Sequence, residues 1–142
     1  MKKLISVSVL LLFVVSIFSA SSIAADKKAQ TKALKQAKVE VYYFHFTRRC
    51  ATCKAVEAET QKAIAALYPV QSKNGLITFK SINLDENSSA ALAKKCNASG
   101  QALLVLSGGK RFDLTEQGFM YALNKPEKLK EELKKGIDPF IK

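Results

Sequence analysis

The chain has 142 residues, which is enough for one compact domain and an export segment. Its 23 lysine and arginine residues outnumber its 12 aspartate and glutamate residues and give a formal net charge of +11. The basic residues are scattered and contain no recognition motif. The composition therefore argues against nucleic-acid binding and favours a solvated, lysine-rich surface, with anionic lipid headgroups or an acidic protein as alternative partners.

The first 25 residues have the pattern of a secretory signal peptide. Lys2 and Lys3 form a charged start, an apolar stretch covers residues 4–18, and small residues permit cleavage near Ala24 or Ala25. The apolar stretch is shorter than the roughly 20 residues of a membrane-spanning helix. We therefore expect cleavage and a periplasmic or secreted protein, with an uncleaved inner-membrane anchor as the alternative.

Residues 26–37 are polar, basic and alanine-rich, which predicts a lead-in linker before a domain over residues 38–142. The run from Val39 to Phe46 is rich in β-branched and aromatic residues at both parities, and this predicts a strand covered on both faces. Residues 51–68 carry apolar side chains at helical spacing, and Pro69 ends the run. A helix is expected there.

The middle of the chain predicts two more strands and a helix. Residues 76–84 alternate in polarity and predict a strand. The segment Asn87–Ser89 is expected to cap a helix that runs to about Lys95. Residues 102–107 predict a short buried strand, which a Gly108-Gly109 hairpin turn joins to a returning strand over residues 110–114.

The last part of the chain predicts two helical pieces. The first covers residues 115–123, and Pro126 opens the second. Leu129, Leu133, Ile137 and Phe140 repeat on one face of that helix. The order of elements is then β-α-β-α-β-β-α. Because parallel strands need a crossover connection, this order predicts an α/β fold with a four-stranded mixed sheet and helices on both faces.

A Cys-x-x-Cys pair, Cys50 and Cys53, lies where the first predicted strand gives way to the first helix. Thiols at this spacing in a β-α-β context indicate thiol–disulfide exchange. Helical spacing places Cys53 on the inward face and Cys50 toward solvent. The helix N-terminus, together with Arg48, Arg49 and Lys54, is expected to stabilise the Cys50 thiolate. We therefore predict that Cys50 attacks and that Cys53 resolves.

Other interpretations of the cysteines stay open. The pair can be a structural disulfide. A zinc site would need a second cysteine pair or a histidine pair, and the sequence has neither. Binding of a soft metal or an arsenical by Cys50, Cys53 and Cys96 is an alternative. Cys96 itself is either a small core residue or a third redox thiol.

Two further residues are candidate proton relays. His45 is the single histidine and ends the first predicted strand, five residues before Cys50. Glu57 lies one helical turn beyond Cys53. Their alternatives are a histidine satisfied at a strand end and an ordinary surface glutamate. No metal and no cofactor are expected.

The strand, the Cys-x-x-Cys helix, the crossover and the closing hairpin and helix over residues 38–141 resemble the thioredoxin superfamily. That family typically has Trp-Cys-Gly-Pro-Cys, whereas Arg49 replaces the tryptophan here and Ala51-Thr52 replace Gly-Pro. It also has a cis-proline before the third core strand. The matching segment, residues 100–103, lacks proline, so we expect a trans peptide at Ala102. The resemblance therefore does not extend to the usual mode of thioredoxin substrate binding.

A combination of four segments more closely resembles a bacterial thioredoxin-like family, the ArsF nitrophenyl compound nitroreductase subunit. These segments are VEVYYFHFTRRCATCKAVEAET, ITFKSINLDE, SGQALLVLSGGK and DLTEQGFMYA. The resemblance implies a small exported thiol protein that exchanges with protein or small-molecule disulfides. It also implies recharging by a membrane thiol-electron permease of the ArsG or cytochrome-c-biogenesis type. The chain has nothing that resembles a flavin or nicotinamide site, so we do not expect it to reduce nitro groups by hydride transfer alone. A fold-only scaffold in a membrane complex is the remaining alternative.

Overall fold

The computed structural model describes residues 38–141. The predicted signal peptide over residues 1–25 and the predicted linker over residues 26–37 lie outside the described residues. Within the described part of the chain, every helix is too short or too polar to cross a bilayer.

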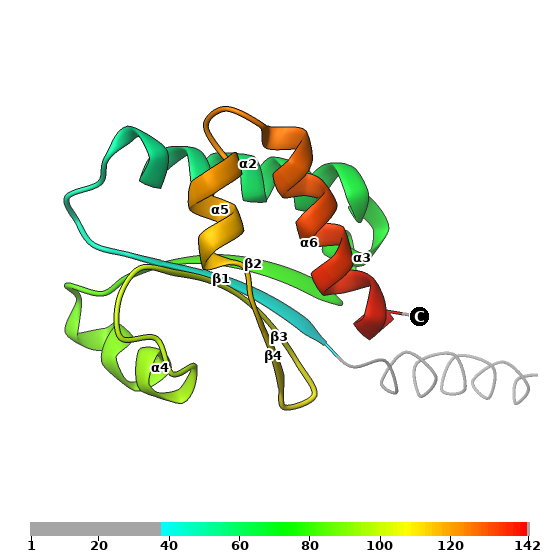
Figure 1. Cartoon of the computed structure of the whole chain (residues 1–142). Coiled ribbons are helices and arrows are strands. Elements are labelled where there is room, and N and C mark those ends of the chain that lie inside the picture. The colour runs from blue at the N-terminus through cyan, green and yellow to red at the C-terminus, as the bar shows by residue number, and fades with distance from the viewer. Residues whose placement is uncertain (1–37, 142) are drawn as a thin grey trace, which may run out of the picture. The chain divides into compact units, whose positions relative to one another are not determined.

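A four-stranded mixed sheet lies at the centre of this part of the chain (Figure 1). Its strands are β1 (Val39–His45), β2 (Ile77–Asn83), β3 (Ala102–Ser107) and β4 (Lys110–Asp113). They lie in the order β2-β1-β3-β4, with β1 parallel to β2 and antiparallel to β3, and with β3 antiparallel to β4. The predicted mixed sheet is confirmed. β2 and β4 are slightly shorter than predicted, although Leu76, Leu84 and Leu114 still form backbone hydrogen bonds with the neighbouring strand.

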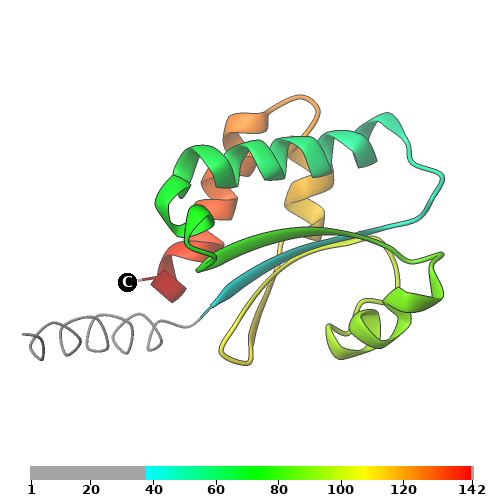
Figure 2. The same ribbon diagram turned by 180° about the vertical axis from the view of Figure 1, so that it is seen from behind.

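Helices cover both faces of the sheet, as Figures 1 and 2 show. The helices are α2 (Ala51–Leu67), α3 (Pro69–Lys73), the 3₁₀ turn η1 (Asn87–Ser89), α4 (Ala90–Lys95), α5 (Thr115–Tyr121) and α6 (Pro126–Ile141). Helices α2, α5 and α6 lie on one face, whereas α4 lies on the other. The prediction of helices on both faces is confirmed.

The helix predicted after Asn87–Ser89 is confirmed, with Ser89 as its N-cap residue and Lys95 as its last residue, but no side chain of the segment caps it. These residues form the 3₁₀ turn η1, and neither η1 nor α4 has a side-chain hydrogen bond at its cap. The hydroxyl of Ser89 instead donates to the carbonyl oxygen of Glu86 at 2.7 Å. A serine hydroxyl can bond to a nearby backbone carbonyl as readily as to an amide, and here the carbonyl is the partner.

Strand β1 is buried on both faces, as its aromatic composition predicted. Val41 and Tyr43 face the core beneath α2, α5 and α6, whereas Tyr42 and Phe44 pack with the α4 side. The two faces alternate because successive side chains of a strand point to opposite sides. Two separate apolar layers therefore hold β1 in place, and a short loop over residues 46–49 joins its last residue to Cys50.

The larger core fixes α2 and α5 against the sheet. Val56 is fully buried, and a Cβ atom at Gly118 of α5 would lie 3.4 Å from its Cγ1 and 3.2 Å from Leu103 Cδ2. Glycine at this position therefore lets α5 approach α2 and β3 closely. On α6, the predicted apolar face is confirmed by the fully buried Leu129 and Leu133.

Candidate functional site

The loop between β1 and α2 is tied to the end of β2. The amide N–H of Thr47 donates to Asp85 Oδ2 at 2.8 Å, and Asn83 Nδ2 donates to Thr47 Oγ1 at 3.0 Å. The hydrogen bond from Thr47 lowers the pKa of the Asp85 carboxyl. This clamp was not predicted from the sequence, although Asp85 lies two residues after β2, which ends beside β1. These hydrogen bonds fix the loop before Cys50 and thereby place Cys50 at the start of α2.

Cys50 and Cys53 form a disulfide at the N-terminus of α2, with their Cα atoms 5.1 Å apart. Cys50 is the N-cap residue, with an extended backbone, and its Sγ accepts the amide N–H of Cys53 at 3.1 Å. Cys50 is exposed, whereas Cys53 is only 4% exposed. The structure therefore has the exposed first cysteine and the buried second cysteine that helical spacing predicted.

The basic side chains around the cysteine pair differ in their exposure and in their ion pairing. Arg48 and Lys54 are exposed, whereas Arg49 is half-buried and forms an ion pair with Glu57. The first turn of α2 contains no acidic residue. Glu57, one turn beyond Cys53, is thus engaged with Arg49 rather than being an unpaired surface carboxylate. Arg49, the charge partner of Glu57 among residues 38–141, belongs to the same loop that carries Cys50.

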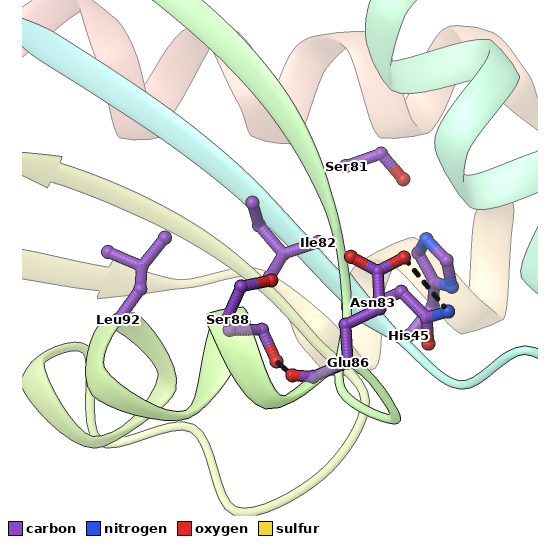
Figure 3. Close-up of a pocket in the computed structure, with 8 residues that line it drawn as sticks. His45, Ser81, Ile82, Asn83, Glu86, Ser88 and Leu92 are labelled. Carbon is purple, nitrogen blue, oxygen red and sulfur yellow. Dashed lines mark hydrogen bonds between the residues drawn. The ribbon is translucent and has the colours of Figure 1, made fainter.

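His45 is buried at the end of β1 and is 8% exposed. Its Nδ1 donates to the carbonyl oxygen of Phe46 at 2.9 Å, which leaves Nε2 as the acceptor in the neutral ring. The histidine also lines a cavity of about 330 Å³ between β2 and the η1–α4 segment, with Ser81, Asn83 and Glu86 (Figure 3). The strand-end hydrogen bond matches the simpler of the two interpretations made from the sequence.

Tyr43 was predicted only as a core residue, but it lies close to the charged part of the site. Its ring centroid is 5.7 Å from that of His45, and its buried hydroxyl has no hydrogen-bond partner among the described residues. Burial raises the pKa of Tyr43 to about 12, with a smaller opposite effect from Arg49. The tyrosine therefore stays protonated at neutral pH. In the sequence, only the position of Tyr43 two residues before His45 on the same strand indicates that the two side chains are neighbours.

Cys96 lies apart from the cysteine pair. It is a free thiol, 4% exposed, in the smaller core with Tyr42 and Phe44, on the sheet face opposite α2. Burial is the main cause that raises its pKa. Within residues 38–141, no three histidine, cysteine, aspartate or glutamate side chains are grouped to hold a metal ion. A site that joins Cys96 to Cys50 and Cys53 is therefore not formed.

The comparisons with known proteins leave the family of this chain open. No protein-family model and no curated protein matches it. Among solved structures, one described as "Structure of a malarial protein" is 21% identical and has a TM-score of 0.43. The match covers 70% of this chain and 98% of that one. A similarity this low assigns neither a family nor an activity.

Proposed function

We propose that this chain is an exported, thioredoxin-like thiol–disulfide oxidoreductase that carries electrons through Cys50 and Cys53. The observation that carries the proposal is the unequal burial of a closed cysteine pair at a helix N-terminus. Cys50 is exposed and can contact a partner, whereas Cys53 is buried one helical turn further along α2. A purely structural disulfide does not need this asymmetry.

The exchange proceeds in two balanced steps in the reduced protein. The Cys50 thiolate attacks one sulfur of a substrate disulfide, which forms a mixed disulfide and releases the first substrate sulfur as a thiolate. Cys53 then loses its proton and attacks Cys50 Sγ, which closes the Cys50–Cys53 disulfide and releases the second substrate thiolate. Two electrons pass from the cysteine pair to the substrate. An external dithiol, for which we propose a membrane permease, restores the pair by the reverse exchange.

The surroundings of Cys50 favour its thiolate. The Cys53 amide N–H already points at Cys50 Sγ, and the unpaired amides of the first helical turn add partial positive charge. Arg48 and Lys54 contribute cations that have no ion-pair partner among the described residues. Arg49 adds less than its sequence position suggests because Glu57 offsets its charge. We propose that this ion pair limits how oxidising the protein is.

The fold supports the same assignment without deciding it. A mixed sheet with the order β2-β1-β3-β4, with the Cys-x-x-Cys helix directly after the central strand, is compatible with a thioredoxin-like fold. The described peptide bonds are all trans, including the one before Ala102. Substrate recognition at that position must therefore differ from that of a protein with a cis-proline. Membership of the ArsF family and location in the periplasm are parts of this proposal.

A trapping experiment tests the assignment of the two thiols. The full-length Cys53→Ala variant, expressed in its native periplasm, should accumulate mixed disulfides through Cys50 that dithiothreitol releases on a gel. The Cys50→Ala variant is the matched control and should accumulate none. Equal trapping by both variants would show that the roles are reversed, and trapping by neither would reject the carrier function.

Binding of a soft metal or an arsenical is the second candidate function. It is less well supported because a shared ligand must contact both sulfurs, and Cys53 is buried. Titration of the reduced Cys96→Ala variant with a trivalent arsenical separates the two functions. Tight stoichiometric binding without any disulfide exchange would favour the binding module.

A further inference from the structure

A second cavity lies at the opposite end of the sheet from the cysteine pair. It has a volume of about 380 Å³ and is bounded by the start of β1, the C-terminal end of α4 and the β3–β4 hairpin. Figures 1 and 2 show that α4 covers only the other end of this sheet face. The short helix therefore leaves a recess between its own end and the hairpin.

Cationic side chains from separate parts of the chain line this recess. They are Lys38 before β1, Lys95 at the end of α4, and Lys110 and Arg111 on β4. Arg111 pairs with Asp113, whereas the three lysines have no ion pair with any described residue. These four side chains are exposed, so water screens their mutual repulsion, but an anion in the recess would be attracted by all of them.

The lining of the recess contains much less negative charge than positive charge. Glu40 is the one carboxylate among its lining residues; burial, and after it the charge of Glu40, raises the pKa of Tyr42 to about 12. Glu40 is paired across the strands with Leu106, which in turn is paired with Arg111. An apolar side chain therefore separates the carboxylate from the guanidinium at this point of the sheet.

The preceding segment of the chain does not have the charge to fill the recess. Residues 26–37 contain Lys27, Lys28, Lys32 and Lys35 but only Asp26 as an acid. The net charge of this segment has the same sign as that of the lining cations. An occupant must instead be anionic. A concave space of this size suits a small molecule better than a flat membrane surface.

We propose that this cavity binds a phosphate-type oxyanion, either as the free ion or as the phosphate group of a small molecule. An anion with several acceptor oxygens and more than one charge can accept from several of these cations at once and is attracted more strongly than a single carboxylate. The proposal is independent of the redox function because the cavity contains neither Cys50 nor Cys53.

The test is an amide NMR titration of the full-length chain at low ionic strength with two probes, inorganic phosphate and phenyl phosphate. Saturable shifts are expected at Lys95, Asn97 and the Gly108–Lys110 turn. The double variant Lys95→Gln/Lys110→Gln should weaken binding by about tenfold, since it removes two charge-assisted contacts of surface strength. The control Lys73→Gln/Lys134→Gln has the same loss of charge away from the cavity and should bind nearly as the unaltered chain does.

Three outcomes would overturn the proposal. The first is that neither probe gives saturable shifts at the cavity. The second is that the control variant weakens binding as much as the cavity variant, which would show only a general effect of net charge. The third is binding to phosphatidylglycerol vesicles but to neither small probe, which would identify a membrane surface in place of a small-molecule site.

Discussion

Cys53 and Cys96 are equally buried, at 4% exposure each, but their surroundings are opposite. Cys53 lies in the first turn of α2, bonded to the N-cap residue, whereas Cys96 is the C-cap residue of α4. Amide hydrogens gather at a helix N-terminus and carbonyl oxygens at a C-terminus, so only the first end favours a sulfur anion. Position along a helix therefore distinguishes two cysteines whose burial is the same.

The largest expected effect is a difference in alkylation rate within one molecule. In the reduced, folded chain at pH 7, iodoacetamide should modify Cys50 about 100-fold faster than Cys96, because Cys50 is exposed at the helix N-terminus whereas burial raises the pKa of Cys96. Mass spectrometry of peptides at timed intervals measures both rates. Unfolding in guanidinium chloride should abolish the difference. Comparable rates in the folded protein would contradict the assignment of Cys50 as the reactive thiol.

Replacement of Cys96 by alanine should affect stability alone. Loss of the buried sulfur from the core with Tyr42 and Phe44 is expected to lower the free energy of unfolding by about 1 kcal/mol. The rate of disulfide exchange should stay unchanged. Denaturant unfolding and a disulfide-reduction assay give the two readouts. A slower exchange in this variant would mean that Cys96 takes part in the chemistry.

Substitutions in the ion pair between Arg49 and Glu57 should have smaller effects, of opposite sign, on the reduction potential. Glu57→Gln leaves the Arg49 charge uncompensated near Cys50, which stabilises the reduced form and should raise the reduction potential by about 10–20 mV. Arg49→Gln should lower it. Equilibration with glutathione measures the potential. Glu59→Gln is the control, since Glu59 pairs with Lys62 on the same helix. An equal shift in that control would remove the assigned role.

The smallest expected effect belongs to the Thr47–Asp85 clamp and depends on pH. Because the folded protein lowers the pKa of Asp85, the stabilisation by this carboxylate is present above its unfolded pKa of about 4 and is lost as the pH falls through the lower folded value. Asp85→Asn should therefore be less stable than the unaltered chain near pH 7, and the two should converge on acidification. Melting temperatures between pH 2 and pH 7 test this. A constant difference would point to a cause other than ionisation.

The sequence predicted the elements better than the contacts between them. The aromatic run of β1 and the helical spacing after Cys50 were sufficient to predict a central strand followed by a helix with one buried cysteine. They could not reveal that Glu57 pairs with Arg49, because that contact depends on how the loop folds back over two helical turns. Asp85 was missed for a related reason. Its partner Thr47 is 38 residues away along the chain, and only the parallel pairing of β1 and β2 brings them together.

The cysteine cross-link closes a ring of very few residues, since its ends are separated by only three positions. The entropy that a cross-link removes from the unfolded chain grows with the length of the loop it closes, so opening this one releases little conformational freedom. The two apolar layers around β1, and not the sulfur bond, maintain the tertiary structure. Oxidised and reduced protein should therefore share one shape, and a partner must distinguish them at the sulfur atoms themselves.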